Sequence, residues 1–239
     1  MATHPPLPSR WACSILIGIL ALSPFRSSAG LAPEEIQQTA AFRKKAECGD
    51  PEAQYVLGLA YAKGRGVAQD LTEATQWFRR SAEGGFASAQ FALGTCFTTG
   101  TGVAKDHVES VKWYRKAADQ GHANAEQALG LCYHNGEGVT KNDPEAMRWF
   151  RKAAEQGRAD AQYVLGYAYA NGLGVPKDEI EAYAFYNLAA SAEELAKGRI
   201  AILDLRLSPE DRQRAQQRTK DLRKEIEAKK AEAAKKTGR

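Results

Sequence analysis

The sequence repeats itself every 36 residues. The string Leu-Gly-x-x-(Tyr or Phe)-x-x-Gly-x-Gly-Val begins at Leu57, Leu93, Leu129 and Leu165, so four copies follow one another in register. A repeat of this length is typical of solenoids, in which a pair of helices cannot bury its apolar face alone and stacks on its neighbours. We therefore expect an all-α fold, a right-handed α-solenoid of about four 36-residue helix-turn-helix repeats with helical caps.

Each unit begins with a short helix that ends in a glycine turn. In the first copy an apolar run from Ala53 reaches Gly64 about eleven residues later, which corresponds to three helical turns. Glycine reaches positive φ without a steric penalty, so each pair of glycines marks the place where the chain reverses. The residues to which we assign this structural role are Leu57, Gly58, Gly64, Gly66, Leu93, Gly94, Gly100, Gly102, Leu129, Gly130, Gly136, Gly138, Leu165, Gly166, Gly172 and Gly174.

A second helix follows each turn and carries a large aromatic residue. Trp77, Trp113, Trp149 and Phe185 occupy equivalent places, each followed by another aromatic residue and then by alanine or serine. This spacing predicts helices whose aromatic side chains pack against small neighbours. We assign these four residues a structural role as well.

The combined pattern resembles that of the Sel1-like repeat family, which is related to the tetratricopeptide repeats. The resemblance runs from Ala53 to Ser191, and four copies in register make it specific. The departures are mild: Phe97 replaces tyrosine, Phe185 replaces tryptophan, and Ser81 and Ser110 replace alanine. In related arrays the first helices line a concave surface, so the resemblance implies a protein-binding groove there.

The chain outside the repeats predicts caps and a tail. We expect a signal peptide at 1–29, an N-terminal capping helix at 30–52, repeats at 53–192 (53–88, 89–124, 125–160 and 161–192), capping helices at 193–217 and a basic tail at 218–239. The tail holds nine Lys or Arg against four Asp or Glu, with Leu222 and Ile226 as its only large apolar residues. A frayed or disordered tail is therefore expected, and contact with anionic lipid, an acidic polymer or a partner is the alternative.

The first 29 residues have the features of an export signal. They contain no acid, Arg10 precedes a twelve-residue apolar run, and Ser27-Ser28-Ala29 supplies the small residues of a cleavage site. The run is shorter than the roughly 20 residues of a membrane span, so we expect no stable span after cleavage, and an uncleaved anchor is the alternative. We therefore expect a periplasmic or secreted protein, and the resemblance to the Sel1-like repeat family implies a bacterial one. Its net charge of +4 does not demand nucleic acid.

The residues that carry chemistry indicate no enzyme, no metal and no cofactor. His107, His122 and His134 lack a ligand partner at helical spacing, and no nucleophile has a base beside it. Equivalent positions of stacked helices lie about 8–10 Å apart, too far for a disulfide, so Cys96 and Cys132 are expected as buried thiols. Cys48 is expected near a helix end, where intermolecular pairing is an alternative. Hydrolysis of β-lactams or peptidoglycan, attributed to cysteine-rich secreted relatives, is the enzymatic alternative that the resemblance implies.

The first helices also predict a binding surface. With Leu57 taken as the direction of the core, residues 55, 59 and 62 point nearly opposite on a helical wheel. The groove residues predicted in this way are Tyr55, Leu59, Phe91, Leu131, His134, Tyr163 and Tyr167. Aromatic anchors suit a peptide, so we expect a non-enzymatic scaffold of the cell envelope that binds a protein segment. The alternatives are stacking on a cell-wall or exopolysaccharide glycan, and packing of these side chains on their own neighbours.

Overall fold

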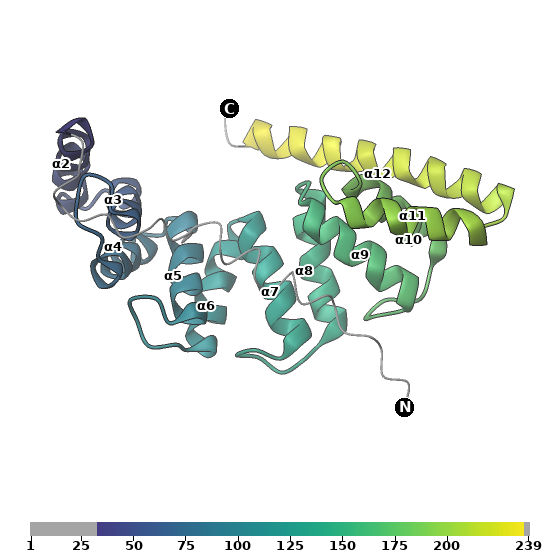
Figure 1. Ribbon diagram of the computed structural model, residues 1–239, viewed down its shortest axis with the longest axis horizontal. Coiled ribbons are helices and arrows are strands. Elements are labelled where there is room, and N and C mark those ends of the chain that lie inside the picture. Colours follow the sequence, from purple (N-terminus) through teal and green to yellow (C-terminus); the bar gives the residue numbers. More distant parts are fainter. Residues whose placement is uncertain (1–32, 237–239) are drawn as a thin grey trace. The chain divides into compact units, whose positions relative to one another are not determined.

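The computed structural model describes residues 33–236, and within that range it consists of α-helices and their connections (Figure 1). The expected signal segment lies outside the described residues. The helices are α2 (Pro33–Glu47), α3 (Pro51–Lys63), α4 (Leu71–Glu83), α5 (Ala87–Thr99), α6 (His107–Asp119), α7 (Ala123–Asn135), α8 (Asp143–Glu155), α9 (Ala159–Asn171), α10 (Glu179–Ala189), α11 (Glu194–Arg206) and α12 (Pro209–Lys236). None of these helices is long and apolar enough to cross a membrane.

The chain forms two compact units, and the boundary between them falls within α7. The N-terminal unit contains residues 33–129 and 137–139, and the C-terminal unit contains residues 130–136 and 140–236. In both units helices pair in antiparallel hairpins, with a 13-residue first helix and a second helix of 11 or 13 residues in each repeat. The all-α repeat fold expected from the sequence is therefore confirmed.

Short polar caps and glycines define the ends of the helices. The Asp70 carboxylate accepts hydrogen bonds of 2.9 Å from the backbone N–H groups of Thr72 and Glu73, and so satisfies two donors at the start of α4. At the end of α5, Gly100 takes a left-handed conformation with φ of 75°. A Cβ on Gly102 would come within 2.0 Å of the Leu71 carbonyl oxygen, so only glycine fits there.

The core of the N-terminal unit interlocks consecutive helix pairs. Leu57 and Leu93 are fully buried, and Trp77 packs with Ala46 and Ala53 of the preceding helices. The exposed side of the Trp77 ring is covered by the Arg80 guanidinium, whose carbon lies 4.4 Å from the ring centre. Trp77 of α4 thus packs both on α3 of its own repeat and on α2, as expected for a solenoid.

A buried glutamine at the start of the first helix makes a link that the sequence analysis did not find. The Gln54 side-chain amide donates to the Ala46 carbonyl oxygen over 3.1 Å, and the Gln90 amide donates to the Ala82 carbonyl oxygen over the same distance. In the C-terminal unit Gln162 repeats this bond with Ala154. Each bond satisfies a carbonyl at the end of a second helix, where helical partners are missing.

The described part of the C-terminal unit ends in a long helix, which corrects the expected frayed tail at 218–239 as far as Lys236. Helix α12 continues to Lys236, and its buried face consists of Ala215, Thr219, Leu222 and Ile226, which repeat at helical spacing. This face packs mainly on α10. Ion pairs support it: Arg218 Nε lies 2.6 Å from a Glu181 oxygen, and Lys229 Nζ lies 2.7 Å from a Glu155 oxygen. The composition predicted a solvated tail because the segment has only two large apolar residues, Leu222 and Ile226. The helix is nevertheless anchored, because both residues lie on its buried face.

Candidate functional site

The seven predicted groove residues do not form an exposed row. Phe91, His134, Tyr163 and Tyr167 are buried, whereas Tyr55, Leu59 and Leu131 are half-buried. The prediction that these side chains point away from the core is therefore wrong for the first four. These four side chains instead agree with the alternative expectation, that they pack on neighbouring side chains.

Phe91 shows the reason within the N-terminal unit. Its ring centre lies 5.6 Å from that of Tyr114 in α6 and 5.0 Å from that of His122 just before α7. A first helix of a solenoid therefore packs on its own second helix and also beside the start of the next repeat. The helical-wheel prediction assumed that each first helix is buried on one side only. It therefore missed the second buried side, where Phe91 lies.

In the C-terminal unit a capping helix covers the predicted groove residues. Tyr163 packs against Tyr186 of α10 with ring centres 5.3 Å apart, and the Arg199 guanidinium of α11 lies 5.8 Å from the Tyr167 ring centre. Burial, with added repulsion from Tyr163, raises the pKa of Tyr186 well above its usual value, and burial also raises the pKa of Tyr167. His134 forms a 2.7 Å hydrogen bond with an oxygen of Asp143.

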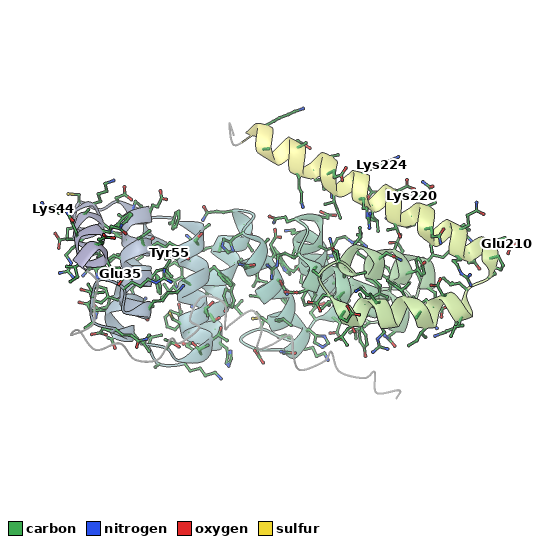
Figure 2. All side chains as sticks on the ribbon, turned by 45° about the horizontal axis from the view of Figure 1, so that its top comes forward. Glu35, Lys44, Tyr55, Glu210, Lys220 and Lys224 are labelled. Carbon is green, nitrogen blue, oxygen red and sulfur yellow. The ribbon has the colours of Figure 1, made fainter. Side chains whose placement is uncertain are left out.

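A hollow between α2 and α3 includes one predicted groove residue, Leu59. Its volume is about 280 Å³, and its apolar lining comes from Phe42, Val56, Leu59 and Ala60. The charged side chains of Glu35, Lys63 and Arg65 border it. Figure 2 labels Glu35 on α2 and the half-buried Tyr55 on α3, the two helices that form the hollow. We call this surface the α2–α3 hollow.

The hollow exists because α2 is a second helix without a first helix of its own among the described residues. Thr39 of α2 donates to the Arg65 carbonyl over 3.1 Å, just as Thr75, one period later, donates to the Thr101 carbonyl over 3.0 Å. The glycine after α2 also has nearly the same φ as its counterpart one period later, 91° at Gly49 and 90° at Gly85. Helix α2 therefore has the structure of a second helix.

The aromatic residue of α2 is more exposed than the equivalent residue of α4. Phe78 of α4 is fully buried, because its ring lies against Gly58 of the first helix in the same repeat. Phe42 holds this position in α2 and is 38% exposed. The α2–α3 hollow thus corresponds to the surface that a first helix covers in the complete repeats.

The cysteines and histidines give no metal site in the described part of the chain. No group of three or more His, Cys, Asp or Glu residues is placed to hold a metal ion there. Cys48 is exposed, and Cys96 and Cys132 are buried, as expected. Burial raises the pKa of the Cys96 thiol, so this sulfur is a poor nucleophile.

Comparisons with known proteins agree with the repeat pattern. The family model described as Sel1 repeat matches residues 51–86, 87–122, 123–157 and 159–193. No curated protein matches the chain. Among solved structures, a Sel1 repeat protein from Oxalobacter formigenes is 38% identical, with a TM-score of 0.67 over 71% of this chain and 50% of that one.

A second solved structure is similar over the same region. It is a protective antigen of uropathogenic Escherichia coli that displays an SLR fold, 42% identical to this chain, with a TM-score of 0.65. The match covers 66% of this chain and 34% of the antigen. The chain thus spans about a third of the antigen and half of the Oxalobacter formigenes protein.

Proposed function

This chain belongs to the Sel1 repeat family, and on that premise we propose that it is a scaffold of the cell envelope that binds a helical protein segment in the α2–α3 hollow. Sel1 repeat proteins are generally protein-interaction scaffolds and are typically non-catalytic. The proposal adds the site, the kind of ligand and the location.

The observation that carries the proposal is the exposure of Phe42. In complete repeats the equivalent ring is covered by a first helix, whereas here it lines an apolar hollow with Leu59 and Val56. An apolar groove between helices is a usual seat for the apolar face of an amphipathic helix. The rim charges of Glu35, Lys63 and Arg65 would then select among ligands and fix their orientation.

The envelope location rests on the sequence of residues 1–29. Their apolar run, the preceding arginine and the small residues at 27–29 support export through a cleaved signal. A glycan ligand, the alternative considered from the sequence, has lost its basis. Stacking on a sugar needs an exposed ring face, and Phe91, Tyr163 and Tyr167 are at most 5% exposed.

Site-specific crosslinking tests the proposal directly. A photoreactive amino acid in place of the exposed Gln38, which lines the hollow, should capture a partner in cells, and the same probe in place of Lys220 on α12 should not capture it. Binding of the purified partner should then be lost in Phe42→Glu.

The control is Val108→Glu, which places the same charge on an exposed apolar residue of α6. This variant should bind as the wild type does. If Phe42→Glu also bound normally, with its helix content unchanged by circular dichroism, the hollow would not be the binding site.

A further inference from the structure

We propose that helix α11 pairs in antiparallel orientation with α11 of a second copy of this chain, so that two copies form a symmetric dimer. The inference goes beyond the proposed function, because it uses a different surface from the α2–α3 hollow. It depends on an apolar stripe of α11 that no helix within residues 33–236 covers, and on the symmetry of that stripe.

Helix α11 packs on the rest of the C-terminal unit with one face only. Ala196 and Leu203 lie on this face and are buried, and α10 is the helix that contacts α11 most. Helix α12 follows directly along the chain, but it packs mainly on α10. The other face of α11 is therefore open in the part of the chain that the structure describes.

Apolar residues gather on this open face. Leu195, Ile202 and Leu205 are 42%, 50% and 89% exposed, and Gly198, which is also exposed, lies between them. We call these four residues the α11 stripe. Three of the six large apolar side chains that are exposed within residues 33–236 belong to it. Such a concentration of exposed apolar surface on one helix indicates an interaction site.

The α11 stripe has the spacing of a coiled-coil seam. Its residues follow one another after three, four and three positions, which is the spacing of alternating a and d positions in a heptad. Such a seam packs on another helix that carries the same spacing, and α11 of a second copy carries it by identity.

The α11 stripe is also symmetric about position 200, and this symmetry selects antiparallel pairing. When two α11 helices run in opposite directions, Gly198 of each copy faces Ile202 of the other, and Leu195 faces Leu205 in the same way. A Cβ on Gly198 would meet nothing within 4 Å, so the space beside it can receive the isoleucine. A parallel pair would set glycine against glycine and leave a gap in the seam.

The charges at the two ends of α11 agree with this orientation. Glu194 stands in the first turn and Arg206 in the last turn. Antiparallel pairing brings Glu194 of one copy to the end where Arg206 of the other lies, whereas parallel pairing sets each charge beside its own copy. Arg206 already pairs with Glu179 of its own chain, so we expect the charges to contribute less than the packing of the stripe.

The predicted dimer is weak and closed. Four residues from each copy form a small interface, so we expect association that depends on protein concentration. The same surface is used on both copies, so the assembly ends at two. Each dimer carries two α2–α3 hollows, and a partner with two helical segments would bind it more tightly than it binds a monomer. Only this last consequence rests on the proposed function.

Sedimentation equilibrium of the purified chain tests the proposal. The weight-average mass of the wild type should rise with concentration and level off at that of a dimer. Leu195→Glu and Leu205→Lys each bury an unpaired charge in the seam, so each should lower the association constant by about tenfold or more. The matched control is Ala228→Lys, which places a charge on an exposed apolar residue of α12 and should associate like the wild type. Circular dichroism checks that all variants keep their helix content.

Mixing the two defective variants gives the decisive result. In an antiparallel pair of one copy of each, the new glutamate faces the new lysine and the remaining two leucines face each other. An equimolar mixture should therefore dimerise with an association constant about tenfold or more above that of either variant alone. In a parallel pair these charges would not meet, and the mixture would not recover.

Four outcomes would overturn the proposal: a wild type that stays monomeric up to about 1 mM, assemblies larger than a dimer, single variants that associate normally, or a mixture that does not recover. If the wild type is monomeric while Phe42→Glu still loses an envelope partner, the proposed function stands and only this inference fails.

Discussion

The ring of Phe78 occupies the space that a side chain on Gly58 would need. A Cβ at position 58 would come within 2.7 Å of the ring carbons, and Gly94 and Tyr114 repeat this relationship at 2.6 Å. The close approach of the two helices in each hairpin therefore depends on a glycine that directly follows the buried leucine.

We expect Gly58→Val to lower the free energy of unfolding by about 1–3 kcal/mol, since the added side chain must displace a buried ring. Thermal unfolding followed by circular dichroism measures this loss. Gly198→Ala is the matched control, because that helical glycine has open space around its Cβ position and alanine favours a helix by up to about 1 kcal/mol. Equal destabilisation by the two changes would contradict the packing argument.

The tryptophans of the second helices should contribute more to stability than any charged residue of α12. Trp113 is 8% exposed and packs with Phe78, Leu93 and Ala62, so Trp113→Ala should cost about 3–5 kcal/mol. Lys224→Ala alters a side chain that projects from α12 into solvent (Figure 2) and should cost less than about 0.5 kcal/mol. Urea unfolding of the two variants checks the difference, and similar midpoints would show that Trp113 does not hold the stack together.

Helix α12 should detach when its apolar contact is removed. Leu222 is 4% exposed, so Leu222→Ser should expose the α12 amides to hydrogen exchange while those of α4 and α5 stay protected. Lys220→Ser, on the solvent face of the same helix, should leave the exchange unchanged. Fast exchange of α12 in the wild type would instead favour the frayed tail that composition suggests.

The sequence predicted the repeat well because its signals are local. Glycine at 64, 100 and 172 is required by a left-handed backbone at the end of each first helix, and this need is visible in four copies of the pattern. The buried leucines and the aromatic residues of the second helices repeat at the same period. The family and the all-α repeat fold follow from these residues alone.

The candidate site was less predictable because it depends on contacts between units. A helical wheel of α5 cannot show that Phe91 meets both Tyr114 and His122, which come from two later segments. The exposure of Phe42 was also hard to predict, because it depends on there being no first helix beside α2 among residues 33–236. The sequence does predict that α2 is a second-type helix, because Ala46 and Gly49 lie one period before Ala82 and Gly85.

Buried tyrosines should make the C-terminal unit sensitive to alkaline pH. Burial raises the pKa of Tyr186 and Tyr167 above the ordinary value of 10.0, so the unfolded chain releases these protons at lower pH than the folded one. Their contribution is complete below about pH 10, and the free energy of unfolding should fall as the pH rises further. Tyr186→Phe, which cannot ionise at this position, should show a weaker fall in the free energy of unfolding between pH 10 and 11.5 in urea unfolding. An unchanged slope in Tyr186→Phe would mean that its hydroxyl reaches solvent.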